Sequence, residues 1–138
     1  MRNYLTQLPQ QVSEAVLIGR QFARAHRPPR VSRILFCGMG GSAISGEILK
    51  ILFARMSRIP FEVSRSVRLP LWVDQKTLLI FSSYSGNTQE VLRVFAQVFR
   101  RTSKVLAVTS GGRLAKRIRT RGGLEIKLPG GIPPRCAI

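Results

Sequence analysis

Short apolar runs alternate with longer helical patterns along this 138-residue chain. Five of the runs are expected to form strands, at residues 33–38, 61–66, 77–83, 104–110 and 124–129. Patterns with helical spacing lie at residues 9–25, 42–56, 88–101 and 112–120. Apolar strands that alternate with helices are typical of a parallel sheet covered by helices on both faces. The alternation therefore predicts a single α/β domain.

The starts of two expected helices carry residues that fit those positions. Pro9 suits the first turn of the helix at 9–25, because proline lacks the N–H that would have no helical partner there. Ser42 is expected to cap the amphipathic helix at 42–56 with its hydroxyl group. Apolar residues recur on one face of the first helix, so residues 1–30 are expected to form a helical segment packed on a domain of residues 31–138.

Three loops that follow expected strands are rich in glycine and hydroxyl residues. They read GMGGSAISG (38–46), SSYSGNTQE (82–90) and TSGGRL (109–114). Right-handed crossovers place all such loops at the carboxyl edge of a parallel sheet, where ligands of open α/β folds bind. Each loop opens into a helix, whose N-terminus attracts anions. Together the loops predict a phosphate site.

The first loop matches the known nucleotide-binding motifs poorly. Gly38 and Gly40 fit the first two positions of the dinucleotide motif G-x-G-x-x-G, but Ala43 occupies the third. The acidic residue expected about 20 positions later is represented only by Glu62. The Gly-Lys-Ser/Thr of a P-loop does not follow the glycines. The loop is therefore a weak candidate for a nucleotide site.

The second loop concentrates hydroxyl groups at a helix start. Ser83, Ser85 and Thr88 surround Gly86 within six residues. A compact phosphomonoester, with several acceptor oxygens, could use all three donors. The alternative is a serine-rich capping turn without a ligand. The presence of the glycine-rich first loop at the same sheet edge favours the phosphate site.

The chain is strongly basic. Its 23 Lys and Arg residues, 18 of them arginines, oppose 6 Asp and Glu residues and give a formal net charge of +17. The arginines are spread along the chain, and stacking aromatic residues are not interleaved with them. This pattern predicts a solvated basic surface that binds nucleic acid only non-specifically.

The cysteines and the apolar content limit the remaining classes. Cys37 and Cys136 form no CxxC motif, so they are expected to be reduced thiols that hold no metal. The sequence shows neither an apolar stretch of membrane-spanning length nor a secretory leader. We therefore expect a cytoplasmic protein without a membrane partner.

At the level of motifs, the chain resembles a known family. The segments GMGGSAISGE, SYSGNTQEVL, VTSGGRLAK and LPGGIPPRCAI resemble the sugar isomerase (SIS) fold. They are most similar to the amino-terminal half of the bifunctional phosphoglucose/phosphomannose isomerases of archaea and some bacteria, over residues 9–138. The resemblance implies a flavodoxin-like, three-layer α/β/α sandwich with a five-stranded parallel sheet, and a 6-phosphosugar ligand without a further cofactor.

The resemblance also implies roles for individual residues. Those expected to hold the substrate phosphate are Gly41, Ser42, Ser83, Ser85 and Thr88. Arg135, in the motif Pro-Pro-Arg, would stabilise the negative charge of an enediolate. The family's general base, ring-opening histidine and further lysine lie in a second SIS domain or beyond it, and this chain has no residues that match them. His26 is expected to end the first helix, and Glu47 and Glu90 to interact with helix dipoles.

The resulting functional hypothesis is an aldose–ketose isomerase of glucose 6-phosphate and fructose 6-phosphate, with mannose 6-phosphate as a second candidate substrate. The chain would be its phosphate-binding domain, with little turnover alone, and would need a second SIS domain or a second copy. One alternative is a non-catalytic SIS module that binds a phosphosugar as a regulatory signal. Another is a basic nucleic-acid-binding domain, for which the sequence shows no concentrated basic face.

Overall fold

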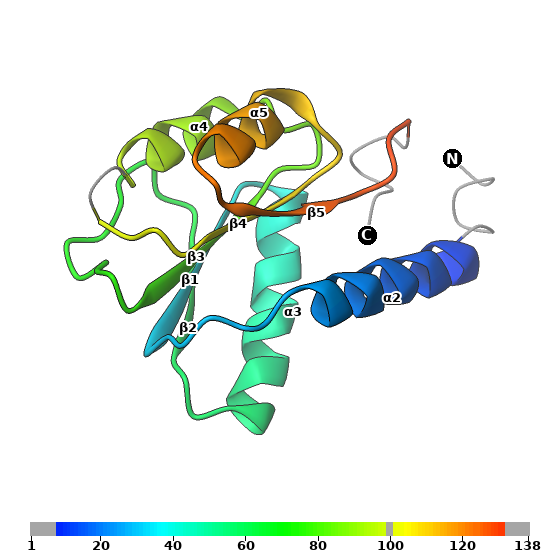
Figure 1. Cartoon of the computed structure of the whole chain (residues 1–138), viewed down its shortest axis with the longest axis horizontal. Helices are drawn as coiled ribbons and strands as arrows, with labels where there is room; N and C mark the ends of the chain where they lie inside the picture. The colour runs from blue at the N-terminus through cyan, green and yellow to red at the C-terminus, as the bar shows by residue number, and fades with distance from the viewer. Residues whose placement is uncertain (1–7, 99–100, 132–138) are drawn as a thin grey trace.

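A five-stranded sheet forms the centre of the molecule (Figure 1). The computed structural model describes residues 8–98 and 101–131. The strands are β1 (Arg33–Gly38), β2 (Phe61–Ser64), β3 (Thr77–Ser82), β4 (Val105–Thr109) and β5 (Leu124–Lys127). They lie in the order β2-β1-β3-β4-β5, and every pair of neighbours is parallel. The predicted five-stranded parallel sheet is confirmed.

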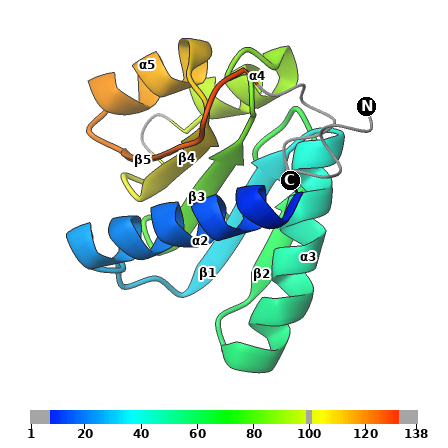
Figure 2. The ribbon, with the colours of Figure 1, turned by 90° about the vertical axis from the view of Figure 1, so that its right-hand side faces the viewer.

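Helices cover both faces of the sheet. They are α2 (Leu8–Ala25), α3 (Gly41–Met56), α4 (Gln89–Ala96) and α5 (Gly112–Thr120). Figures 1 and 2 show α2 and α3 on one face, and α4 and α5 on the other. The predicted three-layer sandwich is therefore confirmed. The chain leaves β1 toward one side of the sheet and β3 toward the other, so the carboxyl ends of these two strands form a topological switch point, where flavodoxin-like folds bind ligands.

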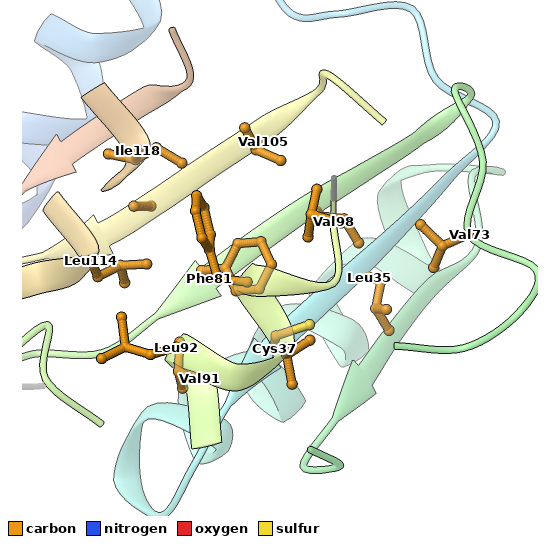
Figure 3. Close-up of a cluster of buried hydrophobic side chains, with 14 residues drawn as sticks. Leu35, Cys37, Val73, Phe81, Val91, Leu92, Val98, Val105, Leu114 and Ile118 are labelled. Carbon is orange, nitrogen blue, oxygen red and sulfur yellow. The ribbon is translucent and has the colours of Figure 1, made fainter. Parts of the chain in front are cut away.

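The layer formed by α4 and α5 contains most of the core (Figure 3). Phe81 of β3 meets Phe95 of α4 in an edge-to-face contact with ring centroids 5.2 Å apart, a favourable aromatic geometry. The buried residues of this layer are Leu35, Cys37, Val73, Leu79, Phe81, Val91, Leu92, Val94, Phe95, Val98, Val105, Ala107, Leu114 and Ile118. We call this half the packed layer.

Cys37 belongs to the packed layer as a free thiol. Burial in apolar surroundings raises its pKa to about 12, because the thiolate would lose its hydration there. The prediction of a reduced, buried thiol is confirmed for this residue. Cys136 lies outside the described residues.

The layer formed by α2 and α3 is much less complete, and we call it the open layer. Its buried cluster consists of Ile34, Phe36 and Phe61, and α2 has no buried residue. The large apolar side chains that α3 leaves exposed are Ile44, Ile48, Leu49, Ile51, Leu52 and Met56. The expectation of an amphipathic helix at 42–56 is therefore wrong, because α3 carries apolar side chains on its solvent side as well as toward the sheet.

The cap predicted for α3 is also wrong. The N-cap residue is Gly40, and the helix already includes Gly41, so Ser42 lies inside the first turn. Within the described part of the chain, no side chain makes a capping hydrogen bond at this end. A positive φ of 53° at Gly40 turns the chain into the helix, a conformation that glycine adopts without steric cost.

Some expected elements are longer than the observed ones. The helix expected at 88–101 ends at Ala96, and the side chain of Gln97 instead donates to Val67 O at 2.7 Å and accepts from Leu69 N at 3.0 Å. The strand expected at 61–66 ends at Ser64, whose hydroxyl accepts a bond from Ser66 N and so begins a turn. In both places a side-chain hydrogen bond, long-range for Gln97 and local for Ser64, accompanies the end of the regular backbone pattern.

Two further observations concern the described residues as a whole. None of their helices combines the length and the apolar character that crossing a membrane requires. They also contain no group of three or more His, Cys, Asp or Glu side chains placed to hold a metal ion. The division of the chain near residue 30 stays a prediction.

Candidate functional site

A cavity of about 340 Å³ opens in the open layer, between α2, α3 and the carboxyl ends of the strands. Its volume lies at the lower end of the range of about 300–1,000 Å³ that is typical of small-molecule sites. The residues that line it are Gln11, Glu14, Ala15, Ile18, Phe36, Met39, Gly41, Ser42, Ser45, Leu49, Ser82, Tyr84, Ser85, Thr88, Val108, Leu128 and Pro129. The cavity therefore lies at the switch point between β1 and β3.

Four of the residues predicted to bind phosphate meet in this cavity. Gly41 and Ser42 belong to the first turn of α3, whereas Ser85 and Thr88 belong to the loop between β3 and α4. The two loops are more than 40 positions apart in the sequence. Parallel strand pairing brings them together, since β1 and β3 are neighbours in the sheet and end at the same edge.

Ser83, the fifth of these residues, does not line the cavity. Its side chain is buried, and its Oγ lies 2.8 Å from Thr88 Oγ1 in a hydrogen bond. Its backbone N–H donates to Val108 O at 3.1 Å. Ser83 therefore holds the side chain of Thr88 in place through this hydrogen bond. Arg135 lies outside the described residues.

Helix N-termini provide much of the electrostatic character of the cavity. Gly41 begins α3, and Thr88 is the N-cap residue of α4. The positive end of a helix dipole stabilises an anion within the first turn. No Lys, Arg or His side chain among the described residues lines the cavity. An anion there would be held by hydroxyl groups, backbone N–H groups and the dipoles of two helices.

The third glycine loop has a different position from the one that the sequence suggested. Apart from Val108 of β4, no residue of the 108–114 segment lines the cavity. Instead this loop supports the second loop from behind. The backbone N–H and the hydroxyl of Ser110 donate to Tyr84 O at 2.9 and 2.7 Å, and Leu114 N donates to Gly86 O at 2.9 Å. These bonds fix the backbone on both sides of Ser85.

Two glycines permit this close contact between the second and third loops. A Cβ on Gly86 would lie 1.8 Å from Gly111 O, and one on Gly112 would lie 2.3 Å from Ser85 O. Both glycines also have positive φ, 65° and 70°, where side chains are strained. Gly86 of the second loop and Gly112 of the third are thus required by the mutual packing of the loops.

Tyr84 connects the second loop to the end of the sheet. It lines the cavity, and its Oη donates to Pro129 O at 2.9 Å. Leu128 and Pro129, which follow β5, also line the cavity. Tyr84 therefore lines the cavity itself and also positions Leu128 and Pro129, which line it beside Tyr84.

Several lining residues were not predicted from the sequence. Ser45 follows Ser42 by one helical turn, and Ser82 is the last residue of β3, directly before Ser83, so helix periodicity and strand alternation could have indicated both. Gln11 and Glu14 come from α2 and line the same cavity. No local pattern indicates them, because their position depends on how α2 lies against the sheet.

The titratable residues considered from the sequence lie away from the cavity. His26 follows the last residue of α2, and its Nδ1 donates to Phe22 O at 3.1 Å, which confirms its position at the helix end. Glu47 forms an exposed ion pair with Arg65 at 3.6 Å. Glu90 lies in the first turn of α4, outside the cavity. Neither glutamate contributes a group to the site.

Comparison with known proteins agrees with this geometry. The SIS domain family matches residues 30–117. The chain belongs to the SIS domain family. It is 37% identical over 131 residues to the bifunctional phosphoglucose/phosphomannose isomerase of Caldicellulosiruptor bescii, an alignment that covers 95% of this chain and 39% of that protein. The enzyme of the same name from Thermoplasma acidophilum is 39% identical over 118 residues, which cover 86% of this chain and 36% of the relative.

A solved structure supports the fold independently. A hypothetical protein from Thermus thermophilus superimposes with a TM-score of 0.68 at 21% identity, over 95% of this SIS domain chain and 35% of that protein. At this identity the likeness concerns the fold alone. In each of these comparisons the chain spans well under half the length of the matched protein.

Proposed function

We propose that this SIS domain binds a 6-phosphosugar and forms the phosphate-binding part of an aldose–ketose isomerase. The proposed substrates are glucose 6-phosphate and fructose 6-phosphate, with mannose 6-phosphate as an additional one. The observation that carries the proposal is the convergence of two hydroxyl-bearing helix starts on one cavity. The similarity to enzymes named phosphoglucose/phosphomannose isomerase supports the choice of substrates.

The phosphate group would bind at the N-termini of α3 and α4. In this proposal the N–H of Gly41 and the hydroxyls of Ser42, Ser85 and Thr88 donate to its oxygens, while Ser83 orients Thr88 through their 2.8 Å bond. Hydrogen bonds to a charged acceptor contribute about 1.5–3 kcal/mol each. Neutral donors and helix dipoles together can therefore hold a dianion without a basic side chain.

The reaction itself moves two protons. Conversion of an open-chain aldose to a ketose transfers one proton from C2 to C1 and one from O2 to O1, through an enediolate. A general base must remove the C2 proton, and a positive group must stabilise the enediolate oxygen. We propose the second role for Arg135, on the strength of its place in the motif Pro-Pro-Arg.

We further propose that the site is completed by a second SIS domain or a second copy of the chain. The chain spans 39% of the Caldicellulosiruptor relative, and α3, which contributes residues to the cavity, exposes several large apolar side chains. Exposed apolar surface of this kind marks an interaction site. The chain alone should bind the phosphosugar and convert it slowly, because Glu14, the one carboxylate that lines the cavity among the described residues, is exposed and lies on a helix with no buried residue.

Binding can be tested by calorimetric titration with glucose 6-phosphate. Ser85→Ala should weaken binding by about ten- to a hundredfold, the equivalent of one charge-assisted bond, and the triple change Ser83→Ala, Ser85→Ala, Thr88→Ala should abolish it. Ser103→Ala is the matched control, since Ser103 is exposed and does not line the cavity. Equal affinity of the wild type and the triple variant would refute the assignment.

Turnover requires a separate experiment. A coupled assay with glucose 6-phosphate should give little product with the chain alone, and rapid turnover with the Caldicellulosiruptor enzyme as positive control. Robust turnover by the chain that survives Arg135→Ala would contradict both the role of Arg135 and the need for a further domain. Tight binding with no turnover, even when a second SIS domain is supplied, would favour the regulatory module.

The basic surface leads to a second proposal about partners. With a net charge of +17 and arginines spread along the chain, binding to nucleic acid should be salt-sensitive and independent of sequence. Filter binding to several unrelated duplexes would measure this. A strong preference for one duplex at moderate salt would instead indicate a dedicated nucleic-acid site.

A further inference from the structure

The cavity contains a single charged side chain, counted over the described residues. Of the residues that line it, only Glu14 carries a formal charge, and that charge is negative. This is unexpected in a chain with 23 basic and 6 acidic residues. A binding site for an anion would be expected to contain the commonest charged residue of the protein, and here it contains the rarer type instead.

Glu14 comes from an element that is separate from the two phosphate-binding loops. Gln11, Glu14, Ala15 and Ile18 follow one another at helical spacing on α2 and line the cavity together. They form the side of α2 that lines the cavity, and Figure 2 shows α2 beside α3 on the same face of the sheet. The helix thus contributes an amide and a carboxylate to a cavity whose hydroxyl groups come from α3, the end of β3 and the loop that follows β3.

Among the residues that the structure describes, no cation pairs with the carboxylate of Glu14. The ion pairs of this part of the chain are Glu47 with Arg65 and Glu125 with Arg119. Asp74 is bound by its own loop, through Lys76 N and the Thr77 hydroxyl. Glu14 takes part in none of these interactions, so no ion pair among the described residues neutralises its charge at the cavity.

We propose that Glu14 is a specificity-determining residue, which favours sugar monophosphates whose remaining part is cationic or neutral and disfavours those with a second anionic group. The inference rests on the proposed function, because it assumes that the phosphate binds at the two helix N-termini. The helix N-termini then attract the phosphate, and Glu14 repels it. Both interactions favour the orientation in which the phosphate lies at the N-termini. An amino sugar phosphate, with an ammonium group on the sugar, is the ligand class that this arrangement suits best.

The expected size of the effect follows from the exposure of Glu14. Its side chain is solvent-exposed, and ion pairs between exposed groups change affinities by about 1.5- to 5-fold. The effect should also diminish with added salt, since exposed charges are screened. Glu14 therefore adjusts the choice among phosphosugars, while the loops supply most of the affinity.

The test is calorimetric titration with three ligands at low ionic strength and about pH 6, where an amine of ordinary basicity is protonated. The ligands are glucosamine 6-phosphate, glucose 6-phosphate and 6-phosphogluconate, which carry an ammonium, a neutral and a carboxylate group on the sugar. In Glu14→Gln, affinity for glucosamine 6-phosphate relative to glucose 6-phosphate should fall by about 1.5- to 5-fold. Relative affinity for 6-phosphogluconate should rise by a similar factor.

Two further variants make the result specific. Glu62→Gln removes the same charge from an exposed position of β2 that does not line the cavity, so it controls for net charge and should leave the relative affinities unchanged. Glu14→Lys should reverse the preference, with 6-phosphogluconate bound better than glucosamine 6-phosphate. Far-ultraviolet circular dichroism and the thermal midpoint would verify that each variant is folded.

The outcomes separate this inference from the proposed function. If wild type binds none of the three ligands, the phosphate site is wrong and the role of Glu14 falls with it. If all three bind and Glu14→Gln leaves their relative affinities unchanged, the phosphate site stands and the selectivity of Glu14 is refuted. The selectivity of Glu14 would also be refuted if Glu14→Gln lowered the affinity for all three ligands equally. The same holds if Glu62→Gln changed the relative affinities as much as Glu14→Gln does.

Discussion

The two faces of the sheet differ sharply in how completely they are covered. Among the described residues, the packed layer, with α4 and α5, encloses a cluster of 14 buried residues, whereas the cluster of the open layer, with α2 and α3, has three. Apolar side chains occur on the helices of both faces, but only α4 and α5 bury most of theirs. Burial of apolar area is the main source of stability. The packed layer should therefore stabilise the fold, while the open layer remains available for other contacts.

The location of the cavity gives this difference a functional meaning. The cavity lies in the open layer, and α2 and α3 supply residues to its walls. A tightly filled layer would leave no space for a ligand, since protein interiors pack as densely as organic crystals. The incomplete packing of α2 and α3 is thus the condition for a binding site on that side. Four experiments can challenge or refine the comparison.

The largest effect is expected from truncating matched leucines in the two layers. Leu114 of α5 is fully buried, so Leu114→Ala should lower the free energy of unfolding by about 2–5 kcal/mol. Leu52 of α3 is 51% exposed. Leu52→Ala should therefore change the free energy of unfolding by no more than about 0.5 kcal/mol. Urea denaturation at low protein concentration measures both. Similar losses in the two variants would show that the open layer is covered in solution.

A smaller loss of stability is expected where the packed layer supports the cavity. Gly86→Ala would place a methyl group 1.8 Å from Gly111 O at a positive φ, so it should cost about 1–3 kcal/mol and abolish binding of glucose 6-phosphate. Gly130→Ala is the control, because its added methyl group would meet no atom within 4 Å. Unchanged affinity in Gly86→Ala would mean that the contact between the second and third loops is unnecessary for the site.

Acid sensitivity should arise at the opposite edge of the packed layer. Hydrogen bonds from the Thr77 hydroxyl, and then from Lys76 N, lower the pKa of Asp74 from 3.8. A lowered folded-state pKa stabilises the native state above the unfolded value of 3.8, and that contribution disappears as the pH falls through the folded-state pKa. Asp74→Asn should therefore lower the thermal midpoint near pH 6. The difference in thermal midpoint between wild type and variant should shrink as the pH falls below 3.8. A difference independent of pH would exclude an ionised Asp74 as its cause.

The smallest perturbation uses thiol reactivity to compare the layers, in a Cys136→Ser background. Because burial raises the pKa of Cys37 to about 12, its thiol should react with an alkylating reagent at about pH 8 at least about a thousandfold more slowly than an exposed thiol. Ile48→Cys places such a thiol on α3, where Ile48 is 53% exposed. Rapid labelling of Cys37 in the native protein would show that the packed layer opens readily, and slow labelling at position 48 would show that α3 is covered.

Much of the fold could be predicted from the sequence, because its signals are local. Buried strands such as β3 consist of consecutive apolar residues, and the glycine loops mark their ends. The chirality of the crossovers then places Ser42, Ser85 and Thr88 at one edge without further information. The errors occurred where a local rule was overridden. Gly40 took the cap position expected for Ser42, and Gln97 ended α4 early by binding a distant loop.

The sequence by itself determined the order of the elements, the parallel sheet and the edge at which the hydroxyl residues meet, because strand alternation and crossover handedness depend on neighbouring residues. Only the tertiary structure decided which of these residues line the cavity and which support it from behind, as with Ser83 and Ser110. It also placed Glu14 in the site and left six large apolar side chains of α3 exposed. Periodicity shows that a helix has an apolar side, but the partner of that side is set by contacts between residues far apart in the chain.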